Sequence, residues 1–274
     1  MPHTQMLKTR SHSARVNPRI RSWRQFDRYV RPDGCSLLRR LDEFPDAILV
    51  AGCQRSGTTI LARLLTQSEG MVNYWFGRDD ELDAALILSG QEEHEPRGRY
   101  CFQTTYLNNC VEEYFSHEQY KLIWVLRNPY SVVYSMLHNW RRAALNRLFR
   151  SCGTTSLGNA EKRRYRLFGT LGVSRIRKAC LSYNVRVSQV FELKERLKED
   201  QLIVVDYQDL VERKEQVLPR IYDFTGLEYR NSYPAKIKST SLGKSSHQPQ
   251  AEARAAEALC MPVYLKARSV LTGI

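Results

Sequence analysis

The sequence has no run of apolar residues that approaches the roughly 20 needed to cross a bilayer. One of its longest apolar stretches, Ile48 to Cys53, is far shorter. No apolar segment typical of a secretory signal precedes the N-terminal arginines. These absences predict a chain with neither a membrane span nor a secretory leader.

Paired cysteines are also absent. The seven cysteines are widely spaced, and they form no CxxC pair and no Cys/His cluster with zinc spacing. An odd and scattered set argues against a disulfide framework and against a structural zinc site. We therefore expect reduced thiols and a cytoplasmic location.

Acidic residues are scarce in two segments only. The whole chain has 42 Lys and Arg against 29 Asp and Glu, a formal charge of +13. Residues 1–31 hold eight basic residues and one acidic residue, and residues 141–178 hold eleven and one. The rest of the chain is therefore slightly acidic. Such basic segments favour an anionic partner, which can be nucleic acid, phosphate or sulfate groups, or an anionic membrane surface.

The domain organisation follows from the same pattern. We predict an N-terminal basic arm over residues 1–40 that is partly disordered, with an organellar transit peptide as the alternative. A single domain over residues 41–274 follows, with a basic helical insert at 141–178 between its core elements.

Three short apolar runs predict buried strands, each followed by a segment with helical spacing. Strands that alternate with helices predict an α/β fold, a three-layer sandwich with a central parallel sheet. Ligands of such sheets bind at the carboxyl ends of the strands. The predicted strands are Ala47 to Ala51, Leu122 to Leu126 and Leu202 to Val205, and the predicted helices are Thr58 to Gln67, Pro129 to Asn139, Ala179 to Lys198 and Val211 to Thr225.

The first strand enters a phosphate-binding type of loop. Residues 52–59 read GCQRSGTT, a P-loop-like strand–loop–helix frame whose amides suit an anion. Thr58 stands where a nucleotide triphosphatase has its Walker lysine, and the cation is Arg55 instead. The second strand ends in Arg127 and not in an acid that would hold magnesium. The loop is therefore suited to binding an anion, but not to binding a triphosphate together with magnesium.

This loop resembles the 5′-phosphosulfate loop of the sulfotransferases that use 3′-phosphoadenosine 5′-phosphosulfate (PAPS). In that family a Lys or Arg at the place of Arg55 neutralises the phosphate leaving group. The resemblance implies that PAPS is bound by Arg55, Ser56, Gly57, Thr58 and Thr59.

A second segment resembles the family's 3′-phosphate motif. After the second strand come Arg127, Asn128 and Pro129, and Ser135 follows eight residues after Arg127. The resemblance implies that Arg127 and Ser135 bind the 3′-phosphate, although Ser131 stands where the family usually has Asp.

A third, weaker match is the Ser/Gly/basic segment 238–246. It gives Lys244 and Ser245 as further cofactor residues, with a polar surface loop as the alternative.

The usual general base is missing. Trp75 and Phe76 occupy the region where family members often have a glutamate, and Gln103-Thr104-Thr105 replaces a common Lys-Thr-His stretch. The candidates for the base are Asp80 or Glu81, and then His94. The alternative for all three is a solvated, charged turn.

The resemblance implies metal-independent, in-line transfer of a sulfuryl group from PAPS to a hydroxyl or amine of a carbohydrate or other small acceptor. The basic segments suit an anionic or lipid-linked acceptor, or peripheral membrane contact. A P-loop kinase and a non-catalytic relative that binds adenosine 3′,5′-bisphosphate (PAP) or another polyanion are the alternatives. The sequence contains no RNP, zinc-finger or similar nucleic-acid-binding motif, so no specific nucleic-acid partner is expected.

Overall fold

Four parallel strands form the sheet that positions the predicted anion loop. Their order is β2-β1-β3-β4, and every neighbouring pair is parallel. Val50 of β1 lies opposite Ile123 of β3, and Val125 lies opposite Val205 of β4. The predicted α/β fold with a parallel sheet is confirmed. The strands are β1 (Ala47–Gly52), β2 (Cys101–Gln103), β3 (Tyr120–Leu126) and β4 (Leu202–Asp206).

The computed structural model describes residues 20–31, 36–77, 79–237 and 248–271. The chain divides into two units, residues 1–35 and 36–274. In the first unit, α1 (Trp23–Tyr29) is capped by the Ser22 hydroxyl, which accepts from the backbone N–H of Gln25. The segment predicted as a basic arm thus contains a short helix. The predicted domain boundary at residue 40 stays a prediction.

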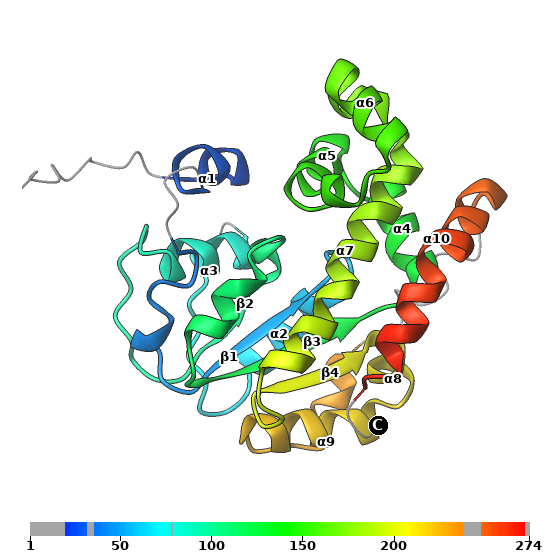
Figure 1. Cartoon of the computed structure of the whole chain (residues 1–274). Coiled ribbons are helices and arrows are strands. Elements are labelled where there is room, and N and C mark those ends of the chain that lie inside the picture. Colours follow the sequence, from blue (N-terminus) through cyan, green and yellow to red (C-terminus); the bar gives the residue numbers. More distant parts are fainter. Residues whose placement is uncertain (1–19, 32–35, 78, 238–247, 272–274) are drawn as a thin grey trace, which may run out of the picture. The chain divides into compact units, whose positions relative to one another are not determined.

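Helices cover both faces of the sheet (Figure 1). Alternate residues of each strand form one core with the first group of helices, as Val50, Ile123 and Ile203 illustrate. On the other face, Trp124 meets the side chain of Arg186. The first group consists of α2 (Thr58–Thr66), α8 (Tyr207–Glu212) and α9 (Lys214–Thr225), and the second of α4 (Pro129–His138), α7 (Arg175–Arg196) and α10 (Gln250–Arg268). A further helix, α3 (Asp80–Leu88), contacts β2.

Residues 141–178 form a helical region that builds a small core together with Leu181 of α7. They comprise α5 (Arg142–Ser151), α6 (Asn159–Phe168) and the start of α7, with short 3-10 turns at Gly153–Ser156 and Gly169–Gly172. Phe149, Leu157, Val173 and Leu181 form the small core, and Tyr165 packs against it.

Two helices differ from the sequence prediction. The segment predicted as one helix over Val211 to Thr225 lies in α8 and α9, which are separated at Arg213. The long helix α7 begins at Arg175 and not at Ala179, because the Ser174 hydroxyl accepts from the N–H of Arg177 and caps it there. None of the described helices is long and apolar enough to span a membrane.

Candidate active site

The loop between β1 and α2 is shaped by two glycines. A Cβ on Gly52, whose φ is +142°, would lie 2.4 Å from the carbonyl oxygen of Val125. A Cβ on Gly57, whose φ is +94°, would lie 2.2 Å from the ring of Tyr207. Glycine alone fits both positions. Gly57 also leaves α2 without a side-chain cap, so the first amides of α2 are suited to an anion.

The two cofactor motifs predicted from sequence meet at the carboxyl ends of β1 and β3. Arg55 Nε donates to Ser135 Oγ at 2.9 Å, and Arg127 Nη1 donates to the carbonyl oxygen of Arg55 at 3.1 Å. The guanidinium carbon of Arg127 lies 4.4 Å from the ring centroid of Tyr207. The backbone of Arg127 is held in turn, because the Tyr183 hydroxyl donates to its carbonyl at 2.8 Å. Three residues predicted from two separate motifs, Arg55, Arg127 and Ser135, are thus neighbours.

This cluster carries excess positive charge in a partly buried place. Removal from water lowers the pKa of Arg55. Burial also lowers the pKa of Arg127, and the adjacent Arg55 contributes to that shift. Ser56 is fully buried, and its hydroxyl oxygen has no hydrogen-bond partner among the described residues. Two cations, a buried hydroxyl and the uncapped helix α2 form a donor set that fits phosphate or sulfate groups.

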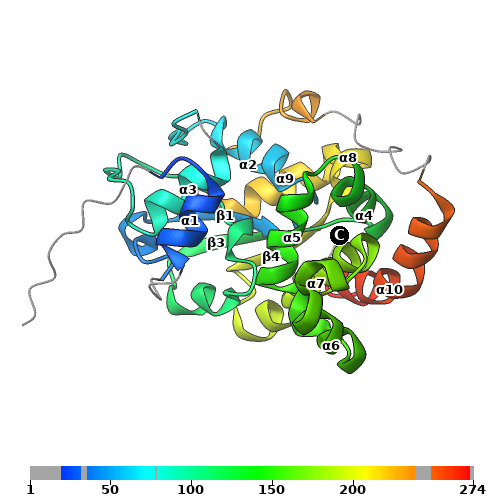
Figure 2. The ribbon, with the colours of Figure 1, turned by 90° about the horizontal axis from the view of Figure 1, so that it is seen from above.

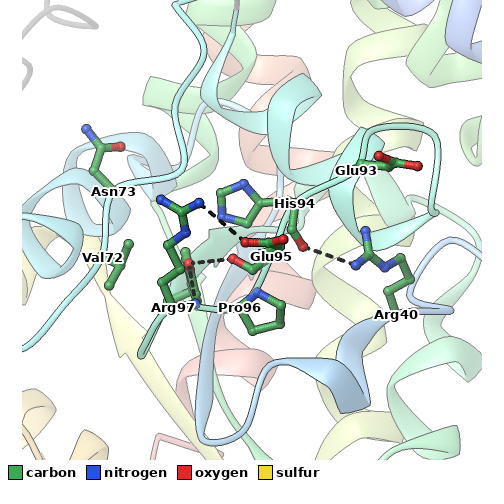
Figure 3. A pocket seen from close by; sticks show the side chains of 9 residues that line it. Arg40, Val72, Asn73, Glu93, His94, Glu95, Pro96 and Arg97 are labelled. Atoms are coloured by element: carbon green, nitrogen blue, oxygen red, sulfur yellow. Dashed lines mark hydrogen bonds and ion pairs between the residues drawn. The ribbon is translucent and has the colours of Figure 1, made fainter.

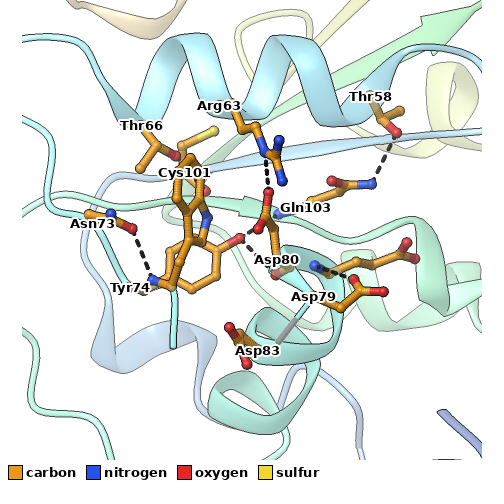
Figure 4. Close-up of polar contacts among 12 residues, drawn as sticks. Thr58, Arg63, Thr66, Asn73, Tyr74, Asp79, Asp80, Asp83, Cys101 and Gln103 are labelled. Carbon is orange, nitrogen blue, oxygen red and sulfur yellow. Dashed lines mark hydrogen bonds and ion pairs between the residues drawn. The ribbon is translucent and has the colours of Figure 1, made fainter. Parts of the chain in front are cut away.

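Two side chains from the end of β2 border this loop. Gln103 Nε2 donates to Thr58 Oγ1 at 3.2 Å (Figure 4). Two residues later, the Thr105 hydroxyl donates to Glu81 Oε1. The first turn of α3 therefore brings the Glu81 carboxylate to the same edge of the sheet as the loop. Thr59, which follows Thr58 in the first turn of α2, is exposed.

The other acidic candidate is engaged elsewhere. The Asp80 carboxylate accepts from Arg63 Nε at 2.5 Å, and the Tyr74 hydroxyl donates to the Asp80 carbonyl at 3.1 Å (Figure 4). Arg63 also lies over the ring of Trp75 at 5.5 Å. Asp80 therefore ties α3 to α2, whereas Glu81 is directed to the end of β2.

His94 lies on the other side of the sheet from this loop, near the amino ends of β1 and β2. Its ring is 6.2 Å from that of Phe44 and 5.3 Å from that of Tyr100, and these two residues precede β1 and β2. It lines a cavity of about 710 Å³ together with Arg40 and Arg97 (Figure 3). Burial lowers the pKa of His94, and the two arginines lower it further. The structure does not bring His94 to Arg55. The remaining candidates, Lys244 and Ser245, lie outside the described residues.

The sequence analysis missed Arg186, which connects the loop after β1 with the loop after β2. This α7 side chain is buried, and it donates to the carbonyl of Gly52 at 2.7 Å, that of Thr105 at 3.3 Å and that of Asn108 at 2.6 Å. A signal was present, since Arg186 has helical spacing with Tyr183 and other buried residues of α7. A charged residue at such a core position indicates a buried polar network.

The described residues contain no group of three or more His, Cys, Asp or Glu side chains that could hold a metal ion. Metal-independent transfer stays a prediction.

Comparisons with known proteins identify the family of this chain. The family model of the sulfotransferase domain matches residues 45–257. No curated protein matches the sequence. Among solved structures, a sulfotransferase from Alicyclobacillus acidocaldarius has a TM-score of 0.51 at 12% identity, over 82% of this chain and 95% of that chain. The sulfotransferase domain of the Synechococcus PCC 7002 olefin synthase has a TM-score of 0.49 at 14% identity, over 85% and 97%. A mouse sulfotransferase complexed with PAP has a TM-score of 0.48 at 16% identity, over 85% and 92%. Because the family match extends over most of the chain, this protein belongs to the sulfotransferase family.

Proposed function

We propose that this sulfotransferase uses PAPS as its donor and a hydroxyl or amine of a carbohydrate or other small molecule as its acceptor. The observation that carries the proposal is the contact of Arg55 with Ser135 and Arg127 at one edge of the sheet. PAPS has a 3′-phosphate and a 5′-phosphosulfate, so it needs cationic and amide donors at two neighbouring positions.

The donors divide naturally between these two groups. Arg127 and Ser135 would hold the 3′-phosphate, because the Arg127 guanidinium can offer two parallel N–H groups to one anion. Arg55, the Ser56 hydroxyl and the first amides of α2 would hold the 5′-phosphosulfate. When bound, PAPS supplies an activated sulfuryl group.

Arg55 and Glu81 have separate tasks in the transfer step. The Arg55 guanidinium stabilises negative charge that develops on the leaving phosphate. The Glu81 carboxylate accepts the proton of the acceptor hydroxyl, and its hydrogen bond from Thr105 orients it for that task. The Asp80 carboxylate accepts from Arg63 instead, so we do not assign proton transfer to it.

We infer the class of the acceptor from the charge of the segment 141–178 and not from the anion loop. Eleven of the basic residues lie in the segment 141–178, between β3 and β4 of the catalytic sheet. The exposed cations among them suit an acceptor that already bears carboxylate, phosphate or sulfate groups, as many glycans do.

The proposal is tested by titration calorimetry of the full chain with PAP in the presence of a metal chelator. We expect a one-to-one complex, and we expect Arg55→Ala to weaken it. Transfer of radiolabelled sulfate from PAPS to a panel of glycans and small alcohols then identifies the acceptor. A folded protein that fails to bind PAP contradicts the proposal, and PAP binding without transfer to any acceptor shows a non-catalytic relative. Magnesium-dependent hydrolysis of ATP would support a kinase instead.

A further inference from the structure

Three large apolar side chains are exposed together at the turn between α6 and α7. The exposed fraction is 76% for Leu167, 63% for Phe168 and 92% for Leu171. We call these three residues the apolar tip. In the described part of the chain only three other large apolar side chains are exposed, and they are far from the tip in sequence. A concentration of this kind marks an interaction site.

The apolar tip is exposed although an apolar core lies nearby. Phe149, Leu157, Val173 and Leu181 form that core, and Tyr165 contacts it with its ring 5.8 Å from that of Phe149. The helix α6 therefore packs its partly buried Tyr165 against this core, whereas Leu167 and Phe168 remain exposed.

Several contacts fix the backbone that carries the tip. A Cβ on Gly172 would lie 2.5 Å from the carbonyl oxygen of Arg164, so the chain returns closely past α6. Lys178 Nζ donates to Thr170 O at 3.1 Å and to Asn146 Oδ1 at 2.7 Å. These contacts from α5 and α7 hold the turn in one conformation, and the tip is presented by an ordered hairpin.

Four cations precede the apolar tip on α6. Lys162, Arg163, Arg164 and Arg166 are all exposed on α6, which has no buried residue. The acidic residue of the segment, Glu161, accepts from Arg177 Nε at 2.8 Å and from Nη2 at 3.2 Å, so its charge is offset. Figure 1 shows α6 beside the end of α7 that lies away from the sheet, and Figure 2 shows the same region from above.

We propose that this hairpin docks the enzyme on an anionic membrane surface, with the apolar tip between lipid head groups and the α6 cations on their phosphates. A nucleic acid would match the cations but not three exposed aliphatic and aromatic side chains. A protein partner would match the apolar side chains, but few protein surfaces are as acidic as these four cations require. An interfacial lipid layer offers both chemistries within a few ångströms.

The test is sedimentation of the full chain with vesicles of phosphatidylcholine alone or of equimolar phosphatidylcholine and phosphatidylserine. We expect binding to the anionic vesicles, weaker binding at high salt, and little binding to phosphatidylcholine. Combined Leu167→Ser, Phe168→Ser and Leu171→Ser changes should weaken binding about tenfold or more, because apolar insertion is lost. Arg163→Glu with Arg166→Glu should do the same, at about fivefold or more per charge.

Matched controls use exposed residues elsewhere. Leu265→Ser on α10 removes an apolar side chain that is 56% exposed, and Lys198→Glu with Arg254→Glu reverses two exposed cations. These variants should bind vesicles as the wild type does. Thermal melting confirms that every variant is folded.

Three results would overturn the proposal. The first is no binding of the folded wild type to anionic vesicles. The second is unchanged binding of the serine variants, which would show that the apolar tip takes no part in membrane contact. The third is a change in oligomeric state of the serine variants, which would make the apolar tip a contact between copies of this chain.

Discussion

Replacement of Arg127 by alanine separates the role of this residue in binding from its role in folding. In the proposed complex its guanidinium makes a bidentate, charge-assisted contact with the 3′-phosphate of PAP. At about 1.5 kcal/mol net for each of two such hydrogen bonds, the loss is about 3 kcal/mol, or about 150-fold in the dissociation constant. Arg127→Lys keeps the charge but not the planar pair of donors, and should give an intermediate affinity.

Arg99 is the matched control for this experiment. Like Arg127 it is a half-buried arginine whose pKa is lowered by burial, and it donates to backbone carbonyls, those of Asp46 at 2.8 Å and Thr225 at 2.5 Å. It lies at the amino ends of β1 and β2, however, across the sheet from the anion loop. Arg99→Ala should lower the thermal midpoint and leave PAP affinity unchanged.

Calorimetric titration with PAP, alongside thermal melting, distinguishes these effects. Our assignment of Arg127 is refuted if folded Arg127→Ala binds PAP as tightly as the wild type. It is also refuted if Arg99→Ala weakens PAP binding to the same extent, because the loss would then report general loosening of the sheet.

Three further predictions concern the base, the opposite edge and the thiols. Glu81→Gln should lower kcat about 10²- to 10⁴-fold and leave PAP affinity unchanged. Asp80→Asn should keep kcat within a few-fold of the wild-type value. Equal losses of kcat in steady-state assays of the two variants would contradict the choice of base. The pKa of His94 is lowered in the folded state, so below about pH 6.5 the unfolded chain binds more protons and stability falls as the pH decreases. Denaturant titrations of His94→Gln should show a smaller fall, and an unchanged pH profile would contradict this. Burial raises the pKa of Cys53 to about 12. Iodoacetamide at mildly alkaline pH should therefore modify half-exposed Cys110 and spare Cys53 until the chain unfolds, as read by peptide mass mapping. Rapid modification of Cys53 in the native protein would be inconsistent with its burial.

The sequence was sufficient for three of the four strands, because each is a continuous apolar run buried on both faces. The strand β2 was missed since it has only three residues and ends in the polar Gln103. The break between α8 and α9 was also missed, because the apolar residues on both sides of Arg213 keep a helical spacing. Local spacing does not show where a chain turns.

The same limit applies to the site. The motifs were sufficient to select Arg55, Arg127 and Ser135, because their chemistry is local to two strand ends. The pairing of Glu81 with Thr105 depends on how α3 packs beside β2, which no local pattern encodes. The packing of Tyr207 against Gly57 likewise joins residues 150 positions apart in the chain. Such contacts are set by the tertiary fold.

One guanidinium serves two loops at once, and this ties their local stabilities together. Arg186 satisfies the carbonyls of Gly52, at the start of the anion loop, and of Thr105 and Asn108, beside the proposed base. Opening either loop leaves part of the same buried cation without its acceptors, which is costly in a low-dielectric interior. The free energies of opening the two loops are therefore not additive. In the proposed reaction, the loop that would bind the donor and the loop beside the proposed base share this one buried cation.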